Sequence, residues 1–481
     1  MDNYLESLVA KADVALKLWS TPSMSVGIIK DGKVIFCRGF GKRDMENGLP
    51  ADEKTLYMIG SCSKAFTATL CMKLQDEGLL NIDRPIREYC DDVRFYDDFA
   101  SREVTLRDLL SHRTGMPRHE FSWYRTPYTR EEMVHNFRYL EPNHELRDAY
   151  QYCNGTFVMA GYICERVTGK TWEELVREYI FEPLHMDRTY VYLDDMEEDE
   201  DHSLPYQKYK KIPYYRTPVE NREKGIGAPY GPAGSIISCA EDMLKWVNFH
   251  LHNNEKILKE SSFRDLHQPQ KLLGIPYPFA MGNSSFDSYG FGWHSSMYYG
   301  HKFLDHTGGI DGYVAYTAFV PDLDLGVVCY TNSGSSYAGI ALGMDIVGHY
   351  LGHDTDLVHV LYKEEEDDSA IMTKMFAGEK IEGTSCSRPL NEFAGTYSRN
   401  GYTDIVIESK GQDLYLHIIG YEVRLEHYHY DTFFTAEKCR ELPKGLPLSF
   451  EKDDHSGDIG YISIPLVMEP GAAPLKFYKK K

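Results

Sequence analysis

The chain has 481 residues, 42% hydrophobic and 13% aromatic, which is enough for a packed core and long enough to favour two domains. The formal net charge of −21 argues against nucleic acid or an anionic membrane as a partner, because both attract basic surfaces. No stretch reaches about 18 uninterrupted apolar residues, so the sequence predicts no membrane-spanning helix.

The first segment, MDNYLESLVAKADVALKLW, has apolar residues at helical spacing between charged ones, so it predicts a helix. It lacks the basic region and the continuous apolar core of a secretory signal peptide. Ten cysteines are scattered without a Cys-x-x-Cys pair, which is typical of buried free thiols in a reducing compartment. These features predict a cytoplasmic protein and no zinc site built from cysteines.

The next elements are a hairpin and a long helical region. Residues 23–44 form two apolar runs joined by Asp31-Gly32, a dipeptide typical of tight β-hairpins. A helix is expected over 61–79, ending near Gly78. A mostly helical stretch from about 85 to 270 follows, interrupted by Gly/Pro loops and by the tyrosine-rich segment 206–218.

Strand patterns return at 289–296, 312–320 and 325–332, and a glycine-rich helix is expected over 337–352. This order indicates an α/β (α+β) fold, with one antiparallel sheet flanked by helices and an inserted helical region. Short strands alternate with turn residues from Leu390 onwards. The predicted domains are therefore residues 1–352, a charged linker over 353–387, and a small β-barrel over 388–481.

The segment Ser61-Cys-Ser-Lys64 stands at the start of an expected helix. The spacing places the Lys64 amine on the same helical face as the Ser61 hydroxyl, where free backbone N–H groups favour developing negative charge. The apolar run after Lys64 would bury the lysine and disfavour its charged form, so that its amine can take the serine proton. The structural alternative is that Ser61 only caps the helix. A second match to the pattern, Ser449/Lys452, lies in a charged β-type segment without such support.

Two further triplets stand in positions that suit a site. Tyr152-Cys153-Asn154 opens an expected helix, and His306-Thr307-Gly308 precedes a strand-rich segment. Each has a decoy elsewhere, namely Tyr330-Thr331-Asn332 and Arg113-Thr114-Gly115. Order and context favour the first pair of triplets, although neither is decisive alone.

Taken together, SCSK (61–64), YCN (152–154) and HTG (306–308) resemble the motifs of the serine β-lactamase and penicillin-binding protein superfamily, specifically its class C β-lactamase-related branch. Similar supporting stretches are LRDLLSHRTGMP (106–117), GPAGSIISCAEDMLKW (231–246) and YGFGW (289–293). The resemblance covers about residues 5–352. The tail, with LNEFAGTYS and HYHYDTF, resembles the lipocalin-like domain that follows the catalytic domain in some relatives.

The resemblance implies that Ser61 is a nucleophile that forms an acyl-enzyme. Lys64 and Tyr152 would share the work of the general base. The oxyanion hole would consist of the backbone N–H groups of Ser61 and Gly309. No metal ion or other cofactor is implied.

The resemblance also implies that Asn154 holds Lys64 and binds the substrate, together with Thr307 and Gly308. It places His306 among the catalytic residues, at a position where Lys-Thr-Gly members carry a lysine that recognises a substrate carboxylate. A histidine is mostly neutral near pH 7, so strict recognition of a carboxylate is not expected. Relatives with His-Thr-Gly are more often esterases, D-aminopeptidases or amidases.

The leading hypothesis is a serine hydrolase, independent of metal, that cleaves ester or amide bonds of small molecules or short peptides. The alternatives are an acyltransferase that uses the same acyl-enzyme, a β-lactamase or DD-peptidase, and a catalytically silent binding protein. The expected partners are the substrate and, as an open question, further copies in a homo-oligomer. The barrel is a stabiliser, an oligomerisation surface, or a wall that narrows the substrate entrance; the sequence does not decide among these.

Overall fold

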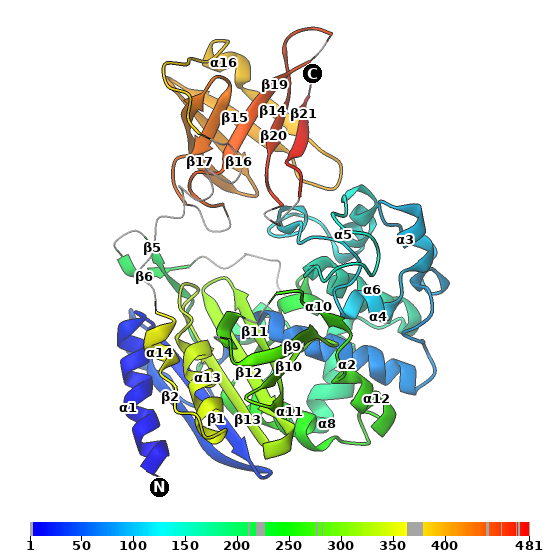
Figure 1. Cartoon of the computed structure of the whole chain (residues 1–481), viewed down its shortest axis with the longest axis vertical. Helices are drawn as coiled ribbons and strands as arrows, with labels where there is room; N and C mark the ends of the chain where they lie inside the picture. The colour runs from blue at the N-terminus through cyan, green and yellow to red at the C-terminus, as the bar shows by residue number, and fades with distance from the viewer. Residues whose placement is uncertain are drawn as a thin grey trace. The chain divides into compact units, whose positions relative to one another are not determined.

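The structure is a computed structural model that describes residues 3–209, 212–217, 227–275, 278–280, 282–362, 379–438, 442–453, 455–467, 469 and 472–480. The chain forms two compact units (Figure 1): unit 1 comprises residues 1–92, 99–115 and 144–362, and unit 2 comprises residues 93–98, 116–143 and 363–481. The chain therefore passes between the units after residues 92, 98, 115, 143 and 362. Within the described ranges, no helix is both long enough and apolar enough to cross a bilayer.

Unit 1 is built on a nine-stranded antiparallel sheet. In spatial order the strands are β3 (Leu49–Pro50), β2 (Lys33–Asp44), β1 (Ser23–Lys30), β13 (Leu325–Thr331), β12 (Tyr313–Val320), β11 (His301–Ile310), β10 (His294–Tyr298), β9 (Ser284–Tyr289) and β8 (Lys271–Leu272). Strands β12 and β13 are buried along their whole length, and β1 along nearly all of it, because helices cover both faces of the sheet there. The predicted antiparallel sheet flanked by helices is confirmed.

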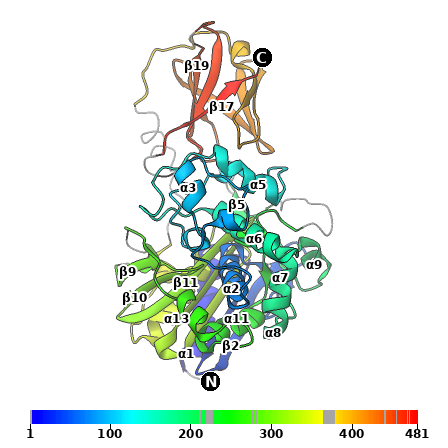
Figure 2. The same ribbon diagram turned by 90° about the vertical axis from the view of Figure 1, so that its right-hand side faces the viewer.

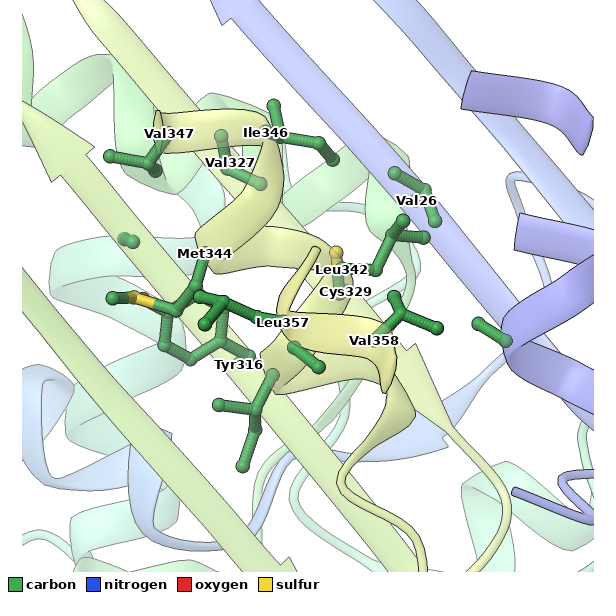
Figure 3. Close-up of a cluster of buried hydrophobic side chains, with 14 of the residues drawn as sticks. Val26, Tyr316, Val327, Cys329, Leu342, Met344, Ile346, Val347, Leu357 and Val358 are labelled. Atoms are coloured by element: carbon green, nitrogen blue, oxygen red, sulfur yellow. The ribbon is translucent and has the colours of Figure 1, made fainter. Parts of the chain in front are cut away.

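One face of the sheet is covered by α1 (Asn3–Leu18), α13 (Ala338–Tyr350) and α14 (Leu357–Val360), and α11 (Ala240–His252) packs on the central strands. Figure 3 shows part of the core under α13 and α14. It joins residues of the sheet and of these two helices, namely Val26, Tyr316, Val327, Cys329, Leu342, Met344, Ile346, Val347, Leu357 and Val358. The central strands are thereby held rigidly, which fixes β11 beside them.

The remaining helices are η1 (Gly60–Cys62), α2 (Ser63–Asp76), η2 (Ile86–Glu88), α3 (Asp98–Glu103), α4 (Leu106–Leu110), α6 (Asn154–Thr168), α7 (Trp172–Val176), η5 (Arg177–Phe181), α8 (Glu182–Leu184), α9 (Leu193–Glu198), α10 (Gly231–Gly234), α12 (Glu260–Leu266), η6 (Pro278–Ala280) and η7 (Pro321–Leu323). Of these helices, α2 and α6 are long and the others are short. Two small sheets accompany them, β4 (Tyr57–Met58) with β7 (Ile237–Ser238) and β5 (Tyr206–Tyr209) with β6 (Ile212–Arg216).

Most of the elements expected in unit 1 are confirmed. Strands β1 and β2 pair as a hairpin across Asp31 and Gly32, whose φ angles are 51° and 67°. The glycine-rich helix is α13. The prediction of a strand over 289–296 is wrong, because this segment contains the end of β9, a turn, and the start of β10. Gly292, with φ of 76°, turns the chain there, which a continuous strand does not allow.

Unit 2 contains the predicted barrel. Eight antiparallel strands close in chain order: β14 (Gly395–Ser398), β15 (Ile405–Lys410), β16 (Asp413–Ile418), β17 (Tyr421–His429), β18 (Thr432–Thr435), β19 (Pro447–Lys452), β20 (Ile459–Ile464) and β21 (Leu475–Lys479), with the short helix α16 (Leu390–Phe393) before them. Alternate residues point inwards, as Leu414, Leu416 and Ile418 do on β16. Pairing of β14 with β21 closes the barrel.

Residues 116–143 belong to the same compact unit as the barrel, and they carry η3 (Glu120–Ser122), α5 (Arg130–Asn136) and η4 (Phe137–Tyr139). The buried ring of His119 contacts the Tyr402 hydroxyl through Nδ1, at 2.5 Å, and the Glu141 carbonyl oxygen through Nε2, at 2.9 Å. Arg399 forms an ion pair with Glu141 at 2.7 Å. These contacts join a segment from the first third of the sequence to the barrel.

Candidate active site

Ser61 is the middle residue of the 3₁₀ turn η1, and this turn directly precedes α2. The helix expected over 61–79 therefore begins two residues later, at Ser63, and ends at Asp76. Ser61 is half-buried, whereas Lys64 is completely buried, with 0% exposure. The turn thus presents the hydroxyl while α2 holds the lysine beneath it.

At least three oxygen atoms surround the Lys64 amine. Nζ lies 2.9 Å from Ser61 Oγ, 2.7 Å from Asn154 Oδ1 and 2.8 Å from the Ala233 carbonyl oxygen. The last two oxygens can only accept hydrogen bonds, so two N–H bonds of the amine point to them. The Ser61 hydroxyl also faces this amine, at a distance that allows the amine to receive its proton.

The Ala233 carbonyl is a member of the site that the sequence did not reveal. It belongs to α10, whose Pro232 carbonyl accepts a hydrogen bond from the Thr67 hydroxyl at 2.7 Å and so ties α10 to α2. The stretch GPAGSI (231–236) resembles the family as a whole, but a backbone oxygen leaves no residue type to read. Only the fold shows that this oxygen completes the environment of Lys64.

Tyr152 and Asn154 lie at the start of α6, as expected, and come to the same place as Lys64. The Tyr152 ring centre lies 5.0 Å from Lys64 Nζ. The backbone N–H of Cys153, the N-cap of α6, donates to His112 Nδ1 at 3.1 Å, and the His112 ring lies 4.3 Å from that of Tyr152. The buried histidine therefore fixes both the chain and the ring of the Tyr-x-Asn motif.

The His306-Thr307-Gly308-Gly309 segment lies within β11, which contacts η1 (both α2 and β11 are labelled in Figure 2). A Cβ at Gly308 would lie 1.9 Å from the Ile59 carbonyl oxygen and 3.0 Å from the Ser61 nitrogen, so only glycine permits this approach. A Cβ at Gly60 would similarly lie 2.8 Å from the Gly309 nitrogen. The backbone N–H groups of Ser61 and Gly309 are therefore brought close together.

His306 is almost completely buried, with 1% exposure, whereas Thr307 is half-buried and Gly309 is exposed. Its Nδ1 lies 2.6 Å from the Thr307 carbonyl oxygen, and its Nε2 lies 2.9 Å from the Tyr289 hydroxyl. Burial holds the pKa of His306 well below its usual value, with smaller contributions from His294 and Lys64. His306 is thus a neutral ring inside the wall of the site.

The decoy motifs have structural roles. The Asn332 side chain accepts a hydrogen bond from the Ser23 backbone and is fully buried between strands. Arg113 forms an ion pair with Asp108 at 2.5 Å. Ser449 lies in the barrel, where its hydroxyl contacts that of Thr432 at 2.9 Å. These three residues therefore have hydrogen-bond or ion-pair partners of their own, away from the Lys64 amine.

One cluster with the ligand types for a metal lies on the barrel. Glu408, His417 and Glu422 present their ligand atoms within 4.8 Å of one another on β15, β16 and β17. The Lys410 amine already lies 3.2 Å from the Glu408 carboxylate and 2.9 Å from that of Glu422. Among the described residues, the clusters of this kind include none of the residues around Ser61.

Comparison with known proteins gives two family matches. A family model described as Beta-lactamase matches residues 12–341, and one described as Domain of unknown function (DUF3471) matches residues 379–479. The chain is 31% identical over 340 residues to the unguisins hydrolase ungD' of Aspergillus campestris (strain IBT 28561), over 68% of this chain. It spans 62% of the length of that relative, which is less than two thirds.

Two solved structures have a similar fold. The octameric penicillin-binding protein homologue from Pyrococcus abyssi superimposes with a TM-score of 0.67 and 23% identity over 100% of both chains. The D-amino acid amidase from Ochrobactrum anthropi SV3 superimposes with a TM-score of 0.57 and 22% identity, over 72% of this chain and 99% of that chain. At this level of identity the likeness concerns the fold.

Proposed function

The chain belongs to the β-lactamase family, and we propose from this premise that it is a serine hydrolase that cleaves ester or amide bonds of small molecules or short peptides. The observation that carries the proposal is the position of the Lys64 amine, 2.9 Å from Ser61 Oγ. The Asn154 Oδ1 and Ala233 carbonyl oxygens beside it can only accept hydrogen bonds, which favours an amine oriented to take the serine proton.

The first half of the reaction acylates Ser61. The hydroxyl proton passes to the base, which Lys64 and Tyr152 share, while Oγ attacks the carbonyl carbon of the substrate. The oxygen of the tetrahedral intermediate carries the negative charge, and we propose that the backbone N–H groups of Ser61 and Gly309 stabilise it; the close approach of the two segments supports this. The bond to the leaving amine or alcohol then breaks, and that group takes up the proton.

The second half releases the acid. A water molecule gives a proton to the same base and attacks the acyl carbon, so that the bond to Ser61 Oγ breaks and the hydroxyl is restored. Asn154 keeps the Lys64 amine oriented through both halves, at 2.7 Å. We propose that Asn154 also binds the acyl side chain, together with the backbone and side chain of Thr307 and the backbone of Gly308.

The similar proteins support amide bonds as one substrate class. One relative is named a hydrolase of unguisins, and one structural neighbour is a D-amino acid amidase. An acyltransferase would need the same residues and differ only in the acceptor of the acyl group. The product of turnover in the presence of an added alcohol or amine separates these two activities.

The proposal is tested by treating the full chain with a fluorophosphonate probe and reading the intact mass. We expect one adduct, at Ser61, and its loss in Ser61→Ala. A screen of acyl esters, D-amino acid amides and the β-lactam nitrocefin then identifies the substrate class. Absence of an adduct on the folded wild-type protein would contradict the proposal and favour a binding protein.

The remaining expectations belong to the same proposal. We propose a cytoplasmic enzyme with a hydrolase domain over 1–352, a linker over 353–387 and a lipocalin-like barrel over 388–481. The closure of eight antiparallel strands in chain order supports the likeness to lipocalins. We further propose a homo-oligomer, since a structural neighbour that superimposes over the whole chain is octameric.

A further inference from the structure

The hydrogen bonds of His306 determine which of its nitrogens carries the proton. The Thr307 carbonyl oxygen, 2.6 Å from Nδ1, can only accept, so the proton of the neutral ring is on Nδ1. Nε2 then has a lone pair, which accepts a hydrogen bond from the Tyr289 hydroxyl at 2.9 Å. Both nitrogens are used within the protein, and neither has a hydrogen left to donate to a substrate.

Tyr289 is placed to maintain this state. It is the last residue of β9, it is 0% exposed, and its ring lies 5.8 Å from that of His306. The turn after it brings Gly292 so close to α2 that a Cβ there would lie 2.7 Å from the Ala65 nitrogen. The same turn that seats β9 against the helix of Lys64 therefore fixes the hydroxyl that faces His306.

The surroundings of His306 do not favour a cation. The ring of His294 on β10 stacks on it at 5.3 Å, and the Tyr152 ring lies 6.4 Å away. The titratable and charged groups that face the His306–Tyr289 pair are His294, Lys64, Tyr152, Tyr150, His112 and Cys62. No carboxylate of the described residues lies within ion-pair distance of His306.

We propose that Tyr289 is a positioning residue that holds His306 in its neutral state, so that the site takes substrates with no carboxylate beside the scissile bond. The inference rests on the proposed hydrolase function and deepens it by naming the substrate class: neutral esters and amides. A substrate carboxylate beside His306 would lose its hydration shell. The neutral ring offers neither a positive charge nor a hydrogen-bond donor to compensate for this loss. The site therefore discriminates against substrates that carry a carboxylate at this position.

The test uses two substrates that differ only in charge, an O-acyl glycolate and the matching O-acyl glycolamide. We expect the wild-type enzyme to prefer the glycolamide in kcat/KM, by at least about tenfold, with a ratio that does not change between pH 8 and pH 5. In Tyr289→Phe the Nε2 lone pair has no partner and becomes free to take a proton. The preference should then shrink by roughly tenfold at pH 5 while it persists at pH 8.

The matched control is Tyr298→Phe, which removes the hydroxyl of another fully buried tyrosine, on the neighbouring strand β10. Its substrate ratio should equal that of the wild type at every pH. A merely structural role of Tyr289 would lower kcat/KM for both substrates equally and leave the ratio independent of pH. That outcome, or a wild-type preference for the glycolate, overturns the proposal.

A second measurement needs no substrate. Long-range ¹H–¹⁵N spectra of the full chain labelled with ¹⁵N-histidine should show His306 with a proton on Nδ1 alone throughout pH 8 to 5. Titration of His306 within this range would refute the inference even if Tyr289→Phe does not fold. Failure of the hydrolase proposal appears differently, as the absence of a fluorophosphonate adduct at Ser61, whatever the tautomer of His306.

Discussion

The sheet of unit 1 and the barrel of unit 2 bury different kinds of side chain. The described barrel strands bury no Asp, Glu, Lys, Arg or His; on β16 the inward residues are Leu414, Leu416 and Ile418. Unit 1 buries Lys64 on α2 and His306 in strand β11 of the sheet, and each has hydrogen-bond partners. Burial of such groups is costly unless each partner is in place, so unit 1 gives up stability for chemistry while the barrel does not.

Each unit contains one of the two Ser-x-x-Lys matches, and the largest effect on acylation should come from the serine of the match in unit 1. Ser61→Ala removes the nucleophile and should lower acylation by many orders of magnitude, to about the level left by binding alone. Ser449→Ala, in the barrel, should react at the wild-type rate. Covalent labelling measured by intact mass decides, and a labelled Ser61→Ala protein would refute the assignment.

The lysines of the same two motifs give the next largest contrast. Lys64→Met keeps a long unbranched side chain in the buried position but removes the amine that acts as the base. We therefore expect kcat/KM to fall by about 10²- to 10⁴-fold. Lys452→Met changes an exposed residue of β19 and should leave turnover unchanged. Steady-state kinetics on an acyl ester measures both. Equal activity of the two variants would mean that another group deprotonates Ser61.

Acid should weaken unit 1 more than unit 2. Burial lowers the pKa of His250, His267, His294 and His306 in unit 1, and in unit 2 it lowers the pKa of His119 to about 4. The pKa of His267 falls to about 3 and that of His294 to about 4, both below the usual value of 6.5. Below pH 6.5 the unfolded chain binds protons that the folded chain does not, so the free energy of unfolding falls as the pH drops towards 4. The slope is about 1.4 kcal/mol per pH unit for each histidine.

Calorimetry between pH 7.5 and pH 4.5 measures this loss. We expect the transition of unit 1 to move to lower temperature with acid, and a transition of unit 2 to move less. Transitions that shift equally would show that buried histidines do not set the acid stability of unit 1.

The buried ring of His119 joins residues 116–143 to the barrel. His119→Ala removes two hydrogen bonds to Tyr402 and Glu141 in a buried position and should lower stability by about 1–3 kcal/mol. Denaturant unfolding measures the loss, and faster proteolysis within 116–143 should accompany it. The exposed His427 offers the control, since His427→Ala should stay within about 0.5 kcal/mol of the wild type. An equal loss in both variants would contradict this account of His119.

The smallest expected effect is that of a chelator. The base in the proposed reaction is an amine, and the step that it catalyses requires no Lewis acid. Turnover should therefore be unchanged after dialysis against EDTA. Loss of activity that zinc restores would overturn the serine mechanism.

Local signals in the sequence predicted much of this molecule. Asp31-Gly32 specifies its hairpin through backbone angles alone, and the alternation after Leu390 specifies barrel strands. The features that escaped prediction are formed between distant segments: the Ala233 carbonyl beside Lys64, and the hydroxyl of Tyr289 at His306. Such partners are selected by tertiary packing, and no spacing rule within one element encodes them.

The join between His119 and Tyr402 also sets an order of events on the ribosome. The two residues are 283 positions apart, which at about 5–20 residues per second separates their synthesis by roughly 15 to 60 s. The barrel closes later still, because its first strand pairs with its last, Tyr397 with Lys479. During that interval the nascent chain displays residues 116–143 without their packing partner.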